Sequence, residues 1–145
     1  NTPRVIDTYE HYTASSNNRI EAAVKVASAG YQIGFIIAPV FLYDNWQNEY
    51  KDLIKSIREK LPKDFNEPII FEVISHRYTT KAKNRILEIF PETTLPMTDE
   101  DRKFKYGQFG YGKYIYSKEQ LSEMKEFFIT HIKEVFPNSI VKYVI

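Results

Sequence analysis

The alternation of short apolar runs with amphipathic helical segments is the feature of this sequence that most constrains its fold. Residues 33–38 form a continuous apolar run, of the kind found in buried parallel strands, and residues 69–74 form a second strand-like run. Residues 4–10, which are rich in β-branched and aromatic side chains, are predicted as a strand that precedes both. A helical pattern follows each run, so three strand-helix units predict an α/β fold with parallel strands and right-handed crossovers.

Capping residues and breakers set the expected limits of the first two units. Asn18 and Glu21 resemble a capping box for the first helix, and Gly30 suits the position just after its end. Pro39 is expected to end the second strand, because proline cannot donate a hydrogen bond to a neighbouring strand.

Two further helices are expected at residues 44–61 and 79–90, each followed by a proline. A capping residue stands at the start of each, so both limits are well marked in the sequence. The side chains of the second of these helices that are expected to face inward are Ala82, Ile86 and Ile89.

The alternation stops after residue 91. A brief helical turn is expected at residues 98–101 and a β-hairpin at 102–116. A long helix should then open with a capping box at 117–120, and a last short strand should cover 140–145. The chain of 145 residues is 43% apolar, which is enough for one core, and it contains no repeat or Gly/Ser linker. We therefore expect one domain over residues 1–145.

The predicted hairpin concentrates basic, aromatic and glycine residues. Three of the five glycines lie in it, although the net charge of the whole chain is only +1. Cationic side chains bind phosphates and aromatic rings stack on bases, so this stretch predicts a nucleic-acid-binding surface. Alternatively, its aromatic residues pack on the core and its lysines protect a sheet edge. The candidate DNA-binding residues are Lys103, Lys105, Tyr106, Gln108, Phe109, Lys113 and Tyr114.

The carboxyl ends of the predicted strands are the other candidate positions, because parallel α/β folds bind ligands there. Ala38 could let a ligand approach the backbone, or it could simply fit a crowded position. Ser75, His76 and Arg77 together suit an anionic ligand. Alternatively, His76 makes only a structural hydrogen bond and Arg77 pairs with an acid such as Glu72.

Several classes of site and protein are excluded or disfavoured by composition. The chain has no cysteine, which excludes disulfides, thiolate zinc sites and cysteine-held iron–sulfur clusters within these residues. Its three histidines show no ligand spacing, so no metal site is expected. No apolar run is long enough to span a membrane, and no glycine-rich phosphate loop opens a helix, which leaves an unrelated small-molecule enzyme a weak alternative.

Three blocks in the chain together resemble the C-terminal part of the spore photoproduct lyase family. They are residues 30–39 (GYQIGFIIAP), 71–79 (FEVISHRYT) and 103–116 (KFKYGQFGYGKYIY). The resemblance implies a partial (β/α) TIM-like barrel. It also implies a radical S-adenosylmethionine enzyme that reverses the thymine photoproduct 5-thyminyl-5,6-dihydrothymine in spore DNA. Its partners would be damaged double-stranded DNA and the N-terminal half of the same enzyme, and it would work in the cytoplasm of the spore core.

The resemblance also assigns expected roles to particular residues. Ala38 should lie near the adenosylmethionine and the lesion, and residues 102–116 should form the hairpin that inserts into DNA. The family carries Arg followed by Tyr at the hairpin tip, where this chain has Gln108 and Phe109, while Lys113 matches the family lysine. The [4Fe–4S] cluster and hydrogen-donor cysteines belong to the family's N-terminal half. No catalytic residue is therefore expected in this chain, which should be inactive alone.

A stand-alone, non-catalytic nucleic-acid-binding α/β domain is the alternative function. The chain begins without Met, in a predicted strand, which favours a segment of a larger enzyme. The sequence upstream of Asn1 would separate the two hypotheses: a three-cysteine motif there would identify the lyase, and a start codon directly before Asn1 would exclude it.

Overall fold

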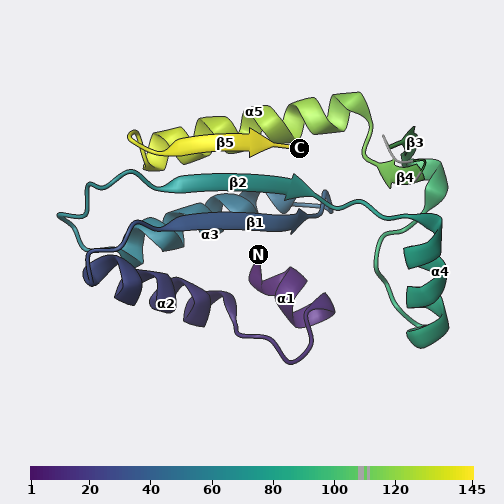
Figure 1. Cartoon of the computed structure of the whole chain (residues 1–145), viewed down its shortest axis with the longest axis horizontal. Coiled ribbons are helices and arrows are strands. Elements are labelled where there is room, and N and C mark those ends of the chain that lie inside the picture. The colour runs from purple at the N-terminus through teal and green to yellow at the C-terminus, as the bar shows by residue number, and fades with distance from the viewer. Residues whose placement is uncertain (108–109, 111) are drawn as a thin grey trace.

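The computed structural model describes residues 1–107, 110 and 112–145, and its elements are labelled in Figure 1. The helices are α1 (Pro3–Tyr9), α2 (Ser16–Ser28), α3 (Trp46–Lys60), α4 (Thr80–Ile89), the 3-10 turn η1 (Asp99–Asp101) and α5 (Lys118–Val135). The strands are β1 (Gly34–Val40), β2 (Ile70–Ser75), β3 (Lys103–Tyr106), β4 (Gly112–Ile115) and β5 (Ile140–Val144). None of the described helices combines the length and the hydropathy needed to cross a bilayer.

Three parallel strands form the main sheet, in the order β1-β2-β5. Side chains alternate in burial along β2: Phe71 and Val73 are fully buried, whereas Glu72 and Ile74 are half-buried. The buried side packs against α3 and α5, whose core residues include Ile54 and Phe128. One face of the sheet therefore carries the core, and the other is left more open (Figure 1).

The prediction of a strand at residues 4–10 is wrong, because these residues form most of helix α1. The Thr2 side chain accepts a hydrogen bond from the Val5 amide, and Pro3 occupies the first turn, where its missing N–H costs nothing. Val5 and Ile6 are buried on this helix. The β-branched composition predicted a strand, but the capping Thr2 and the Pro3 that follows it favour the start of a helix.

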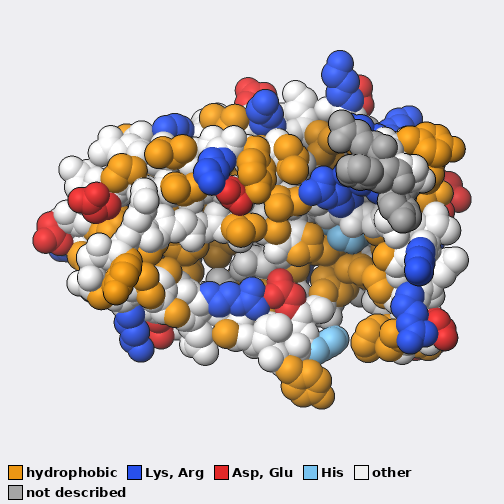
Figure 2. All heavy atoms as spheres, viewed as in Figure 1, with side chains coloured by type: hydrophobic (Ala, Val, Ile, Leu, Met, Phe, Trp, Pro, Cys, Tyr) orange, Lys and Arg blue, Asp and Glu red, His pale blue; other side chains and the backbone are white. Residues whose placement is uncertain are grey.

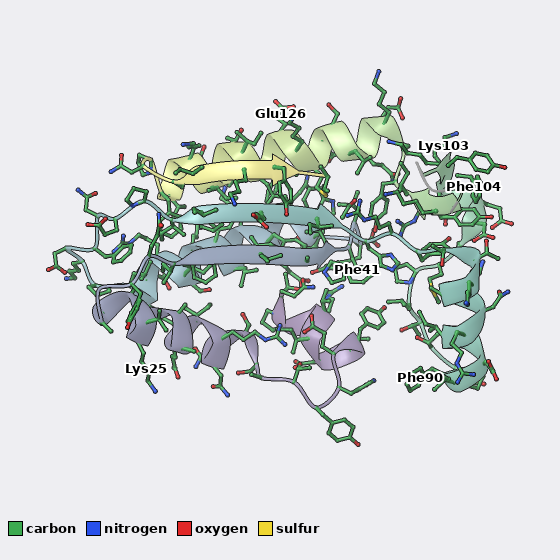
Figure 3. The ribbon with its side chains drawn as sticks, in the orientation of Figure 1. Lys25, Phe41, Phe90, Lys103, Phe104 and Glu126 are labelled. Atoms are coloured by element: carbon green, nitrogen blue, oxygen red, sulfur yellow. The ribbon has the colours of Figure 1, made fainter. Side chains whose placement is uncertain are left out.

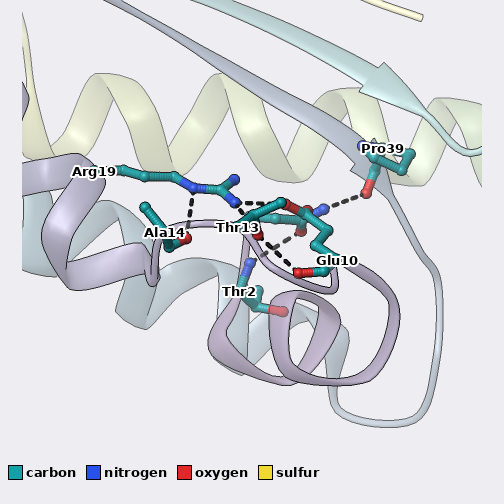
Figure 4. A network of polar contacts seen from close by, with 7 residues as sticks. Thr2, Glu10, Thr13, Ala14, Arg19 and Pro39 are labelled. Carbon is teal, nitrogen blue, oxygen red and sulfur yellow. Dashed lines mark hydrogen bonds and ion pairs between the residues drawn. The ribbon is translucent and has the colours of Figure 1, made fainter.

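A polar network holds the N-terminal segment in place (Figure 4). The Arg19 guanidinium donates to the Glu10 carboxylate at 2.7 Å and to the Thr13 hydroxyl at 2.8 Å. The Asn1 side-chain amide donates to the Pro39 carbonyl at 2.8 Å. Glu10 and Thr13 are thereby used to attach α1 to the start of α2, and Asn1 attaches the chain to β1.

Two smaller predictions about α2 and β1 are also corrected. The cap of α2 is Ser15, whose hydroxyl accepts from the Asn18 amide, so Asn18 lies inside the helix. Strand β1 continues through Pro39 to Val40, with an irregular register between Ile37 and Val40. A proline is tolerated there because β1 is an edge strand and the register shift removes the need for a ladder hydrogen bond.

Helix α4 begins at the predicted cap, Thr79, but it does not bury its apolar side chains. Ala82 is exposed, Ile86 is half-buried and Ile89 is 51% exposed. The prediction that these residues face a core is wrong, because α4 lies beyond the end of the sheet and not over its face (Figure 1). Its apolar side instead borders a cavity described below.

The later elements match their predictions. Ser117 and Gln120 form the capping box of α5, with both reciprocal hydrogen bonds present. Strand β5 then lies parallel to β2 and supplies the third strand of the sheet in place of residues 4–10. The connection from β2 to β5 carries α4, the hairpin β3-β4 and α5, and this long excursion places the hairpin at the carboxyl end of the sheet.

Candidate functional site

The hairpin β3-β4 has an aromatic face and a basic face, because side chains alternate along a strand. Phe104 lies opposite Tyr114, and Lys105 lies opposite Lys113. Phe104 also contacts Tyr106 edge to face, with ring centroids 5.0 Å apart, and Tyr106 is 77% exposed. Lys103 and Phe104 project from the hairpin end of the molecule in Figure 3. The predicted mixture of basic and aromatic residues is thus sorted into two surfaces.

The Phe104 ring lies across Gly112, and this explains why a glycine stands there. A Cβ atom at Gly112 would overlap the ring of Phe104. The absence of a side chain lets the aromatic face lie flat against the backbone of β4. Gly112 therefore shapes the aromatic face and not only the turn.

The hairpin is attached to the segment that follows β2. Tyr78 and Tyr114 exchange two backbone hydrogen bonds, of 3.2 and 2.7 Å, and their rings stack with centroids 5.2 Å apart. The Tyr78 hydroxyl donates to Asp99 at 2.9 Å, and Lys83 donates to the same carboxylate. Burial, followed by the hydrogen bond to Asp99, raises the pKa of Tyr78. The hairpin base is therefore fixed to both β2 and α4.

Arg102 joins the base of the hairpin to the end of the sheet. It is 8% exposed, and its guanidinium donates to the carbonyls of His76 at 2.9 Å and Pro96 at 3.1 Å. It also lies 3.6 Å from the centroid of the Tyr116 ring, whose hydroxyl accepts from the Leu42 amide. Arg102 is thus a buried structural residue whose hydrogen bonds connect parts of the fold.

His76 is held neutral at the carboxyl end of β2. Its ring is 7% exposed, stacks on Phe41 with centroids 4.5 Å apart, and places Nδ1 3.3 Å from the Arg102 guanidinium. Burial, and secondarily the positive charge of Arg102, lowers the pKa of His76 to about 4. The ring is therefore uncharged near neutral pH and does not provide a positive charge for an anion.

An apolar cavity of about 820 Å³ opens beside His76. It lies between α1, α4 and the carboxyl ends of β1 and β2, and Pro39 and Phe41 form part of its wall. Ile89 and Phe90, which are about half exposed, border it from the end of α4. Its walls and the neutral imidazole suit an uncharged, planar ligand group better than a phosphate.

A basic groove of about 400 Å³ lies on the other side of the β2 terminus. It is bordered by the basic face of the hairpin, by the first turns of α5 and by the end of β5, and we call it the basic groove. Its cationic lining residues are Arg77, Lys105, Lys113, Lys118 and Lys125, and its described lining includes no Asp or Glu side chain. Figure 2 shows Lys and Arg side chains gathered around this end of the molecule.

The structure separates residues that the sequence grouped together. His76 faces the apolar cavity, whereas Ser75 and Arg77 line the basic groove. Glu72 is bonded to Lys142 and Tyr143 instead of Arg77. The three neighbours in sequence therefore do not form one anion site, since successive residues after a strand point in different directions.

The remaining candidates are placed as follows. Ala38 lies in β1 and lines a groove of about 240 Å³ bordered by α2 and α3; it is not among the residues that line the cavity at His76, although its neighbour Pro39 is. Lys105 and Lys113 lie in the basic groove, while Lys103 lines a separate pocket with Arg102. Two further candidates, Gln108 and Phe109, fall outside the described residues.

Sequence reasoning missed the buried role of Arg102 and the lysines of α5 that face the hairpin. Arg102 opens the predicted basic hairpin, but it is buried, whereas its neighbour Lys103 is exposed. Lys118 and Lys125 are seven residues apart and so share one side of a helix. The sequence therefore indicated that the two lysines share a face of the helix, but nothing in it indicated that this face turns toward the hairpin.

Comparisons with known proteins all identify one family. The sequence model described as "Spore photoproduct lyase" matches residues 1–145. The spore photoproduct lyase of Clostridium acetobutylicum is 54% identical over 145 residues, and that of Bacillus subtilis is 41% identical over 143. These matches cover 100% and 99% of this chain but 42% of each relative, so the chain spans less than half of their length.

Solved structures agree with the sequence comparisons. A spore photoproduct lyase complexed with dinucleoside spore photoproduct superposes with a TM-score of 0.94 at 35% identity. A mutant of a spore photoproduct lyase with bound AdoMet and the same dinucleoside gives 0.93. Each covers 99% of this chain and 42% of the larger chain, so the α/β fold described above is that of one part of those structures.

Proposed function

Because this chain belongs to the spore photoproduct lyase family, we propose that it is the lesion-binding part of an enzyme that reverses the thymine photoproduct in DNA. The geometry that carries the proposal is the two-faced hairpin at the carboxyl end of the parallel sheet. An aromatic face can stack on or wedge between bases, and a basic face can hold the backbone of the same duplex. A stand-alone nucleic-acid-binding domain would need the same hairpin, but the family relationship favours the lyase.

The apolar cavity and the basic groove suit different parts of such a substrate. The apolar cavity, with Phe41 and the neutral His76 on its wall, suits bases that have left the stack. The basic groove suits phosphates. A related structure is a complex with dinucleoside spore photoproduct, which supports the thymine photoproduct as the proposed ligand.

The chain itself cannot hold an iron–sulfur cluster in the way the family requires. It contains no cysteine, and its described residues include no group of three or more His, Cys, Asp or Glu side chains placed to bind a metal. We infer that the cluster is held by the N-terminal half of the enzyme, which would supply the radical chemistry with adenosylmethionine. In this scheme Ala38 on β1, whose neighbour Pro39 lines the apolar cavity, lies close to the cofactor and the lesion. The present chain positions the DNA and acts in the cytoplasm of the spore core.

Substitutions in the hairpin test the proposed function in the full-length enzyme. Lys113→Ala should weaken binding to duplex DNA at low salt and reduce the slope of log affinity against log salt by about one. Lys25→Ala, at the far end of the molecule in Figure 3, is the matched control and should leave the slope unchanged. A normal slope in Lys113→Ala would show that this lysine does not contact the backbone.

A second substitution separates lesion recognition from general DNA binding. We expect Phe109 to act as a wedge between bases. Phe109→Ala should therefore weaken binding to duplexes that contain the photoproduct more than binding to undamaged duplexes, because inserting a side chain costs least where base stacking is already disturbed. Electrophoretic or fluorescence titrations of the two duplexes measure the ratio. Equal losses of affinity for the two duplexes would contradict the role of Phe109 as a wedge.

A further inference from the structure

Positive charge is concentrated in the basic groove, whose described lining includes no Asp or Glu side chain. None of its five cations, Arg77, Lys105, Lys113, Lys118 and Lys125, forms an ion pair with another described residue. Three elements contribute them: the segment after β2, the hairpin and α5. Burial, and then the charges of Arg77 and Lys105, lowers the pKa of Lys113. Lys113 is therefore close enough to Arg77 and Lys105 to be repelled by them.

Two of the placements break local rules of stability. Lys105 and Lys113 lie directly opposite each other in the antiparallel hairpin, where like charges are unfavourable. Lys118 is the first residue of α5, where the helix dipole disfavours a cation. Such violations are expected where a site is built for a ligand, because the ligand offsets the cost. The missing ligand should be an anion.

Two hydroxyl residues also line the groove. Ser75 is 3% exposed, lines the groove, and its hydroxyl makes no side-chain hydrogen bond to another described residue. Ser122 adds a second hydroxyl from the same side of α5 as Lys118 and Lys125. Hydroxyl donors beside unpaired cations form a suitable environment for phosphate oxygens.

We propose that Lys118 and Lys125 of α5, with Arg77 and Ser75, bind the phosphodiester backbone of the DNA strand that the hairpin engages. This inference rests on the proposed function and extends the DNA interface from the hairpin to α5. The groove adjoins the basic face of the hairpin, so one strand of DNA contacts Lys105 and Lys113 and then α5. The end of β2 divides the basic groove from the apolar cavity, because Ser75 and Arg77 line the groove and His76 lines the cavity.

Salt-dependent binding of undamaged duplex DNA to the full-length enzyme tests the proposal. The double variant Lys118→Ala/Lys125→Ala should reduce the slope of log affinity against log salt by about two, and weaken binding near 0.1 M salt by roughly tenfold for each lysine. The matched control is Lys25→Ala/Lys55→Ala, which removes the same charge from α2 and α3 outside the groove and should keep the wild-type slope. Lys118→Arg/Lys125→Arg should also keep it.

The outcomes distinguish this inference from the proposed function. If the wild-type enzyme binds duplex DNA and Lys113→Ala weakens it, but the α5 double variant keeps the full slope, the groove assignment is wrong and the proposed function stands. If the wild-type enzyme does not bind duplex DNA at all, both fail. Equal effects of the α5 and control variants would also overturn the assignment, since the loss would then follow net charge alone.

Inorganic phosphate separates a backbone site from a small-anion site. Added at constant ionic strength, it should raise the thermal midpoint of the wild type little, because a single free phosphate lacks the neighbouring contacts of a strand. A clear rise in the wild type that is lost in Lys118→Ala/Lys125→Ala, together with an unchanged DNA slope, would identify a site for small anions and overturn the proposal. Retained circular dichroism spectra establish that the variants are folded.

Discussion

At the scale of single residues, the site depends on a buried pair whose members have opposite electrostatic roles. Three acceptors and an aromatic ring surround the Arg102 guanidinium, while burial and the nearby guanidinium lower the pKa of His76, so that its ring is neutral. The pair fixes the hairpin to the sheet without adding a free cation to the apolar cavity. Sequence position gave no sign of this, since arginine is usually exposed and histidine is only intermediate in its burial.

This pair predicts a pH dependence of stability. The pKa of His76 falls from an unfolded value near 6.5 to about 4, so between these values the unfolded chain binds more protons than the folded one. Stability is therefore complete above pH 6.5 and decreases by up to about 3 kcal/mol as the pH falls to 4. Denaturant unfolding of the full-length enzyme should show this loss. His76→Asn should flatten it, and His11→Asn, at an exposed position, should not.

Nuclear magnetic resonance titration of the histidine ring gives the matching direct test. Arg102→Met keeps apolar bulk over the Tyr116 ring but removes the charge, so it should raise the pKa of His76 part of the way toward 6.5. Arg85→Met removes an arginine that is exposed and paired with Glu88, and should leave the titration unchanged. An unchanged pKa of His76 in Arg102→Met would show that burial alone is responsible.

At the scale of elements, the hairpin β3-β4 acts as a small two-sided sheet. Four cross-strand pairs hold it, and the bridge between Tyr78 and Tyr114 connects it to β2. Its aromatic face depends on the contact between Phe104 and Gly112. The sequence identified the hairpin because aromatic runs and glycines are local signals. It did not show that one face turns to the basic groove.

A double-mutant cycle tests the aromatic face. Gly112→Ala should displace the Phe104 ring and reduce DNA affinity several-fold, with little loss of stability because Phe104 is 48% exposed. In a Phe104→Ala background the same change should have almost no further effect, since the overlap no longer exists. If the effects of the two substitutions on duplex affinity are additive, the contact between Phe104 and Gly112 is not the cause of the loss.

At the scale of the whole molecule, one side of the sheet is uncovered in this chain, and we propose that another part of the enzyme covers it. Strand β1 is an edge of the sheet, and the groove beside it is bordered by Ile20 and Ala23 of α2. Ile36 of β1 is 65% exposed within this region. Edge strands with apolar side chains are normally covered. The relatives, of which this chain spans 42%, are long enough to provide such a cover.

Substitution of Ile36 tests whether the N-terminal half covers this edge. In the full-length enzyme Ile36→Glu should destabilise the fold by about 2–3 kcal/mol, because it would bury a carboxylate in place of an apolar group. Ile129→Glu, on an exposed position of α5, should change stability by less than about 0.5 kcal/mol. If both substitutions are equally mild in denaturant unfolding, Ile36 remains exposed in the complete enzyme.

The sequence by itself determined the elements whose signals are local: the apolar strands β1 and β2, the capping box of α5, the hairpin and the absence of cysteine ligands. It failed at residues 4–10, where a cap and a proline outweighed β-branched composition, and at α4, whose apolar face borders a cavity. Only the tertiary structure decided that His76 and Arg77 face different cavities, that Arg102 is buried, and that lysines from the hairpin and α5 meet in one groove. These outcomes depend on the long connection from β2 to β5, because contacts between residues distant in sequence are fixed by packing and not by local pattern.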